Sequence, residues 1–223
     1  LLKTPHIGLL CLDVLDRLEV SYEVHGGPGM CCGILQMRGG DDANSLRQGT
    51  RSLARFAETG TQQVLSWCPT CQLQFSETTL PVQASPSPFD LTMFPVYLAD
   101  QLERLRPHLR KPIPKRIALH EHPGTPGVVD AVHRLLGAVQ GIEIVELSTP
   151  KIGYSLTALA AVPEIQSRLL AEELQLAADA QVDTLVTIFH TEHRELAVQA
   201  QGVPFEIANY MEIVGNAMGV HQE

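Results

Sequence analysis

The chain has 223 residues, of which 44% are hydrophobic and 18% are charged, as in a globular protein with a buried core. Its net charge is −9 and no basic cluster stands out, so nucleic acid is not expected as a partner. No apolar run is long enough to span a membrane, and the residues from Leu1 onward lack the order of a secretory signal. Five cysteines, two of them adjacent, suit a reducing cytoplasm better than a secreted disulfide framework.

Strands and helices alternate along the chain. Hydrophobic periodicity predicts helices at 7–17, 45–58, 96–105, 128–139 and 158–180, a helical turn from residue 72, strands at 19–24, 63–67, 116–121, 142–147 and 184–189, and a Pro- and Ser-rich loop at 80–90. This alternation predicts an α/β fold of two pseudo-symmetric βα repeats, each with a small, mainly parallel sheet flanked by helices. The predicted domains are residues 1–110 and residues 111–223.

Two pairs of segments indicate that the repeats arose by duplication. The stretch TQQVLSWCPTCQLQF is similar to VDTLVTIFHTEHREL, and FPVYLADQLERL is similar to VPFEIANYMEIV. In the first pair, Cys68 and His190 each follow a predicted strand. Ligands of α/β folds bind beyond the carboxyl ends of strands, so both positions are candidates for chemistry.

Four of the five cysteines fall into two tight clusters. Cys31 and Cys32 precede Gly33, and Cys68 and Cys71 lie in the motif CPTC. Four thiolates can converge on one soft metal centre, as in iron–sulfur and zinc sites. Glycines let a backbone bend around a cluster, and a thiol between a strand and a helix has a lowered pKa. The alternatives are small core residues or a plain dithiol, such as a thioredoxin-like site at CPTC, which would leave the vicinal pair unexplained.

The motifs GPGMCCG and WCPTC resemble those of the CCG cysteine-rich domain of heterodisulfide reductase B, and the resemblance extends over nearly the whole chain. Related domains occur in lactate-utilisation iron–sulfur oxidoreductases and in the anchor subunit of anaerobic glycerol-3-phosphate dehydrogenase. The resemblance implies that Cys31, Cys32, Cys68 and Cys71 hold an iron–sulfur cluster, either [4Fe–4S] or the noncubane type known in that family. That family places a further cysteine ligand well before its vicinal pair, at a position upstream of Leu1. With four thiolates, a cubane cluster or a zinc ion is the more plausible expectation.

The same resemblance implies a function. It indicates an iron–sulfur oxidoreductase subunit that cleaves or forms a disulfide, with a disulfide or thiol substrate and flavin- or ferredoxin-type redox subunits as partners. The chain has no G-x-G-x-x-G or G-x-x-x-x-G-K pattern, so flavin and nicotinamide are expected on partners. The alternatives are a non-catalytic electron-relay subunit and a zinc-binding subunit of a larger dehydrogenase or reductase complex.

The second half carries histidines where the family carries cysteines. His190 and His193 replace its C-x-x-C pair, and His120 and His122 lie in HEHP. No thiolate remains there, so a second iron–sulfur cluster is not expected. Neutral imidazoles with a neighbouring glutamate suit zinc or iron, which predicts a histidine-rich metal site. The alternative is that these histidines are solvated loop or helix-cap residues.

Overall fold

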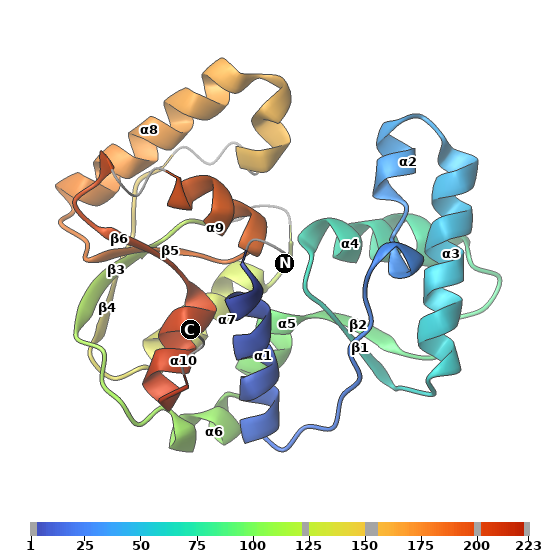
Figure 1. Ribbon diagram of the computed structural model, residues 1–223, viewed down its shortest axis with the longest axis horizontal. Helices are drawn as coiled ribbons and strands as arrows, with labels where there is room; N and C mark the ends of the chain where they lie inside the picture. Colours follow the sequence, from blue (N-terminus) through green and yellow to red (C-terminus); the bar gives the residue numbers. More distant parts are fainter. Residues whose placement is uncertain (1–3, 122–124, 150–155, 199–201, 221–223) are drawn as a thin grey trace. The chain divides into compact units, whose positions relative to one another are not determined.

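The computed structural model describes residues 4–121, 125–149, 156–198 and 202–220 and divides into two compact units (Figure 1). Residues 22–97 form the cysteine unit, which contains all four motif cysteines. Residues 1–21 and 98–223 form the sheet unit. Among the described residues, no helix is long and apolar enough to cross a membrane.

The sheet unit is built on four parallel strands in the order β4-β3-β5-β6. The strands are β3 (Lys115–Leu119), β4 (Ile142–Val145), β5 (Thr184–Thr187) and β6 (Glu206–Asn209). All four residues of β5 are buried, because helices cover both of its faces. The strand order reverses between β3 and β5, so their carboxyl ends form the topological switch point where α/β folds bind ligands.

Helices pack on both faces of this sheet (Figure 1). On one face, α8 (Pro163–Asp179) and α9 (His190–Ala197) bury apolar side chains against Ala118 and Leu185. On the other lie α7 (Val128–Gly137), α10 (Tyr210–Met218) and α1 (Pro5–Arg17). The shorter helical elements of this unit are α6 (Leu102–Leu105), η4 (Arg106–His108) and η5 (Leu156–Ala161).

The cysteine unit has a two-stranded parallel sheet of β1 (Gln63–Ser66) and β2 (Asp90–Met93). Its helical elements are η1 (Pro28–Met30), α2 (Ile34–Arg38), α3 (Asp42–Glu58), α4 (Pro69–Leu73), the π-helix η2 (Gln74–Thr79) and η3 (Leu80–Val82). The helix α5 (Phe94–Asp100) follows β2 directly. The core contains Cys32, Leu53, Phe75 and Phe89, and the ring of Phe56 lies edge-on to both phenylalanines.

The structure confirms the predicted α/β class, with small parallel sheets flanked by helices. The strand predicted at 19–24 is wrong. The chain leaves α1 at Glu19, whose φ of 54° is left-handed, and Val24 is 69% exposed, so this segment has neither strand geometry nor a buried face. The strands β2 and β6 were not predicted, because each is short and runs directly into a helix.

The compact units differ from the predicted division at residue 110. Residues 1–21 belong with the C-terminal part of the chain, because the apolar face of α1 packs against α10. Gly215 makes this packing close, since a Cβ there would lie 2.8 Å from Cδ2 of Leu10. The pseudo-symmetric duplication stays a prediction.

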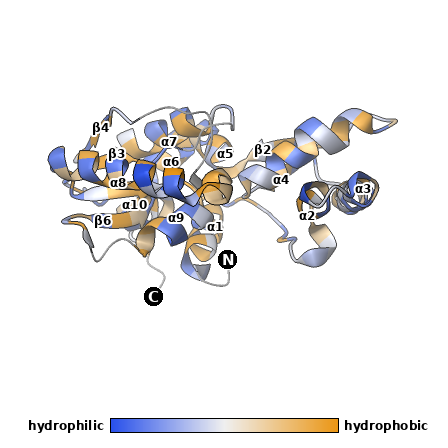
Figure 2. Cartoon of the chain, turned by 90° about the horizontal axis from the view of Figure 1, so that it is seen from above, coloured by the Kyte–Doolittle hydropathy of each residue, from blue (hydrophilic) through white to orange (hydrophobic). Residues whose placement is uncertain are grey.

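One face of α3 holds the loop that carries the vicinal cysteines. Figure 2 shows hydrophilic residues along much of α3, and its buried positions are mostly small. Three side chains of this face donate to loop carbonyl oxygens: Ser52 Oγ to Cys31 at 2.7 Å, Gln48 Nε2 to Pro28 at 3.3 Å and Arg55 Nη1 to Gly29 at 2.5 Å. The loop is thus fixed through its backbone, which leaves the cysteine sulfurs free for other contacts.

Glycines bring the loop and α3 into backbone contact. Gly33 has a φ of +88°, and a Cβ there would lie 2.4 Å from the carbonyl oxygen of Ser45. A Cβ on Gly49 in α3 would lie 2.6 Å from Thr79 Oγ1 and 3.2 Å from the Cys32 carbonyl oxygen. No side chain fits at either position, and Cys32 is held in the core without exposure.

This contact predicts that Gly33→Ala is strongly destabilising. The left-handed φ costs about 1–2 kcal/mol for a residue with a Cβ, and overpacking against Ser45 costs about 1–3 kcal/mol more. Gly40→Ala is the matched control, because Gly40 also has a positive φ, of +77°, but nothing lies within 4 Å of its Cβ position. Denaturant unfolding should show a larger loss of unfolding free energy for Gly33→Ala than for Gly40→Ala. Equal losses would contradict the proposed role of the contact between Gly33 and Ser45.

Candidate metal centre

Cys68 lies where β1 passes into α4. It is the N-cap residue of α4, and Pro69 occupies the first helical position, where a missing N–H costs nothing. The pKa of Cys68 is lowered to about 6, first by a hydrogen bond from the Cys71 thiol and, against the effect of burial, by the backbone N–H groups of Cys71 and Thr70. Cys68 is therefore mainly a thiolate at neutral pH.

Cys32 is the second acidic thiol. A hydrogen bond from the Cys71 thiol lowers the pKa of Cys32 to about 7, although burial opposes this, and the backbone N–H of Ile34 adds to the effect. The pKa of Cys71 is raised for the opposite reason, because its thiol donates to both neighbours. The three sulfurs therefore gather around Cys71.

The hydrogen bond of Cys31 is to the backbone of its own loop. Its sulfur accepts the backbone N–H of Gly33 at 3.5 Å, and its side chain is partly exposed. It neighbours Cys32 in the chain. The contacts of Cys71 thus bring together three of the four predicted cysteine ligands, which are Cys32, Cys68 and Cys71.

The donor set fits a soft metal centre. Thiolates are ligands of both zinc and iron–sulfur sites, and backbone N–H groups aimed at the sulfurs tune such sites. Among the described residues, no three cysteine sulfurs all lie within 4.8 Å of one another, whereas Cys71 contacts Cys32 and Cys68 in turn. The residues present therefore fit either an iron–sulfur cluster or a zinc ion.

The described histidines of the predicted site are His120, His190 and His193, and His120 and His193 have different side-chain partners. His120 follows β3, is 4% exposed, and its Nδ1 lies 2.9 and 2.8 Å from the two carboxylate oxygens of Glu173 in α8. Burial alone would lower the pKa of His120, but this carboxylate holds it above the usual range. Burial raises the pKa of the nearby Glu192 to about 7. His122 lies outside the described residues.

His190 and His193 begin α9. Burial lowers the pKa of His190, whose Nδ1 is buried without a hydrogen-bond partner among the described residues. His193 Nδ1 lies 3.3 Å from Thr187 Oγ1. Within the described chain, His193 meets His6 and Glu212 as potential metal ligands, not His120 or His190.

Sequence reasoning missed three residues of these groups: His6, Glu173 and Glu212. His6 and Glu173 stand in helices without any motif, so no local signal marked them. Glu212 could have been found from the sequence. A glutamate three residues after Asn209 is the pattern of a capping box. Only the fold brings these side chains to the histidines.

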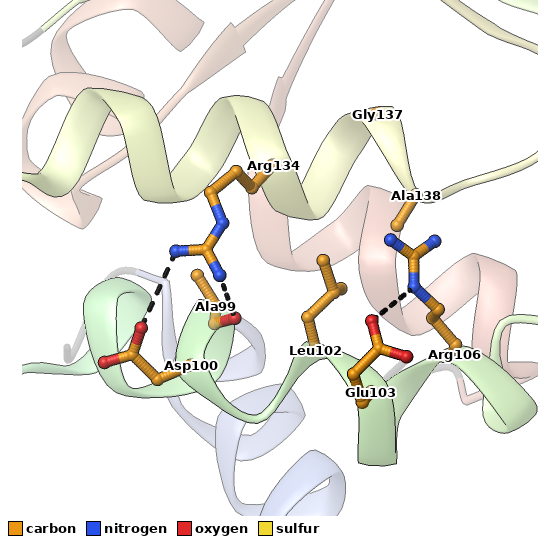
Figure 3. Close-up of a pocket in the computed structure, with 8 residues that line it drawn as sticks. All are labelled: Ala99, Asp100, Leu102, Glu103, Arg106, Arg134, Gly137 and Ala138. Carbon is orange, nitrogen blue, oxygen red and sulfur yellow. Dashed lines mark hydrogen bonds and ion pairs between the residues drawn. The ribbon is translucent and has the colours of Figure 1, made fainter.

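The hollow drawn in Figure 3 belongs to the sheet unit and contains none of the predicted site residues. Arg134 lies across it, 3.6 Å from Asp100 and 2.9 Å from the Ala99 carbonyl oxygen. Arg106 pairs with Glu103 at 3.0 Å. These are exposed ion pairs of small energetic value, and neither a cysteine nor a histidine is among the residues that line the hollow.

The thiol contacts predict how the reduced, metal-free protein reacts with iodoacetamide. The alkylation rate of Cys68 should rise with pH around a midpoint near 6, because only the thiolate reacts. Cys71→Ala removes the donor and should move the midpoint toward the ordinary thiol value, whereas Cys71→Ser keeps an O–H donor and should leave it nearly unchanged. Mass spectrometry of the labelled peptide measures each rate, and the same midpoint in both variants would contradict the assignment.

Comparison with known families agrees with the cysteine motifs. Residues 3–76 match the family model of the cysteine-rich domain CCG, and the match includes all four motif cysteines. No curated protein matches the chain. The CCG domain occurs in iron–sulfur redox proteins in general. The match confirms, for residues 3–76, the likeness to a CCG cysteine-rich domain predicted from GPGMCCG and WCPTC.

Proposed function

We propose that the cysteine unit holds an iron–sulfur cluster through Cys31, Cys32, Cys68 and Cys71, and that the protein is a cytoplasmic oxidoreductase subunit of the heterodisulfide reductase B type. The observation that carries this proposal is the gathering of Cys32 and Cys68, with pKa values of about 7 and 6, around Cys71. Thiolates are the form that binds metal, and two of the four are favoured before any metal arrives.

The chain's own groups would hold and shield the centre. Backbone N–H groups of Thr70 and Cys71 stabilise negative charge on Cys68, and the N–H of Ile34 does so on Cys32. The core around Phe75 and Phe89 excludes water from Cys32. A bound cluster would supply electron transfer, with a potential set by these hydrogen bonds and by burial.

The proposed reaction is the reduction of a disulfide to two thiols, or the reverse. It consumes two electrons and two protons, and the electrons would come from a flavin- or ferredoxin-type partner subunit, because the chain has no dinucleotide-binding glycine pattern. Cys31, Cys68 and Cys71 are partly exposed, whereas Cys32 is buried, so a substrate thiol would approach the centre from the side of these three sulfurs.

A second candidate is a cluster-free dithiol at Cys68 and Cys71. The observation in its favour is the opposite direction of the two pKa shifts, lowered for Cys68 at the helix start and raised for Cys71. That pairing is typical of C-x-x-C redox sites, in which one thiolate attacks a disulfide and the second thiol resolves the mixed disulfide. This second candidate gives no role to Cys31, to Cys32 or to the loop that α3 holds through its backbone.

Protein purified without oxygen tests the proposal. The wild-type protein should absorb in the visible range, and Cys68→Ala should lose this absorption and the bound iron. Cys11→Ala is the control that should keep both, because Cys11 is buried in α1, where its thiol donates to the Ile7 carbonyl oxygen. Unchanged absorption and iron in Cys68→Ala would overturn the cluster assignment. A colourless wild-type protein that reduces disulfides only while Cys68 is present would establish the dithiol instead.

A further inference from the structure

A second group of metal-ligating side chains lies in the sheet unit. It consists of His6 in α1, His193 in α9 and Glu212 in α10. One nitrogen or oxygen atom of each lies within 4.8 Å of those of the other two. His6 Nε2 is 3.5 Å from Glu212 Oε1, and the rings of His6 and His193 are edge-on at 72°, with centroids 6.2 Å apart. His193 is buried and the other two are partly buried, so the group lies just beneath the surface.

The tautomer of His193 follows from its neighbour. Thr187 Oγ1 lies 3.3 Å from the Ala208 carbonyl oxygen, to which only the hydroxyl can donate. A hydroxyl has one proton, so at the 3.3 Å contact with His193 Nδ1 the hydroxyl accepts and the imidazole donates. The neutral ring then carries its lone pair on Nε2. A hydrogen bond at the other ring nitrogen is how proteins orient a histidine that binds a metal.

Glu212 is also held in place by a second contact. Its Oε2 accepts the backbone N–H of Asn209 at 2.6 Å, while Asn209 Oδ1 accepts the N–H of Met211 at 3.0 Å. This capping box fixes the carboxylate at the start of α10 and leaves Oε1 facing His6. Two of the three side chains are therefore positioned before any ligand binds.

We propose that His6, His193 and Glu212 bind a zinc ion or a similar divalent transition metal. Imidazole and carboxylate ligands bind zinc at about 2.0–2.2 Å, which places ligand atoms about 3.3 Å apart in a tetrahedron. The 3.5 Å between His6 and Glu212 already meets this requirement. Two histidines and one carboxylate leave the fourth position for water or a substrate atom, as in hydrolytic zinc sites rather than closed structural ones.

The site is independent of the cysteines. All of its residues belong to the sheet unit, and the ion would join α1, near the start of the chain, to α9 and α10, near its end. The ion would stabilise the packing of α1 as well as offer an open coordination position. Failure of the iron–sulfur proposal would leave this site unaffected.

Titration of the metal-free protein, with all 223 residues present, with Co²⁺ tests this site. Cobalt at histidine and carboxylate ligands gives d–d absorption without the near-ultraviolet charge-transfer band that thiolates add, so the two kinds of site are read separately. The wild-type protein should bind one Co²⁺ with d–d absorption that survives in Cys68→Ala and is removed by Zn²⁺ competition. A signal that appears only with the thiolate band, or disappears in Cys68→Ala, would overturn the proposal.

Variants of the site sharpen the test. Glu212→Gln keeps the capping box, since glutamine also serves there, but loses the anionic ligand. Thr187→Val removes the contact with His193 Nδ1 and should lower the affinity roughly 10–100-fold. Glu212→Gln should weaken binding more than this. His6→Ala, at a partly exposed position, removes one of the three ligands and should abolish Co²⁺ binding. The control is His25→Ala, because His25 lies in the cysteine unit, where it contacts the exposed Glu23 and the ring of Phe56. Unchanged Co²⁺ affinity in both Glu212→Gln and His6→Ala would overturn the assignment.

Discussion

The backbone contact between Gly33 and the Ser45 turn of α3 is the constraint on which the cysteine site depends. A loop that carries two adjacent cysteines can present both sulfurs only if its backbone is held from behind. Here, a face of small side chains in α3 and three hydrogen bonds to loop carbonyl oxygens do this. Cys32 is thereby buried against Phe75 and Phe89, within reach of Cys71. The glycines around the motif are therefore as important to this packing as the cysteines are.

The contacts among the sulfurs follow from that arrangement. Cys71 lies between Cys32 and Cys68 and shares its proton with both, so the proton on one thiol stabilises charge on two others. Burial raises the energy of each thiolate, and the backbone N–H groups at the start of α4 and α2 offset it. Such a group is poised to exchange one shared proton for metal, in agreement with the match of residues 3–76 to a cysteine-rich domain.

The sequence predicts local features of this protein better than its long-range contacts. The CPTC motif after a predicted strand correctly places Cys68 at a helix start, and the alternation of apolar segments correctly predicts parallel sheets. The pairing of His120 with Glu173 and of His193 with His6 could not be predicted, because each joins elements that are distant in the chain. The placement of α1 beside α10 depends on Gly215 accepting Leu10, which no periodicity encodes. The predicted four-histidine site rested on a local repeat, and in the described residues His120 contacts Glu173 while His193 lies beside His6 and Glu212.

The central claim is that four cysteines of one compact unit hold an iron–sulfur cluster. Iron, zinc and acid-labile sulfide, measured per chain on protein purified without oxygen, test this claim most directly. We expect iron with a matching amount of sulfide, and any zinc found beside them belongs to the sheet unit. Zinc alone, or a protein without iron and sulfide, would contradict the claim and show that the domain has kept its cysteines without the cluster.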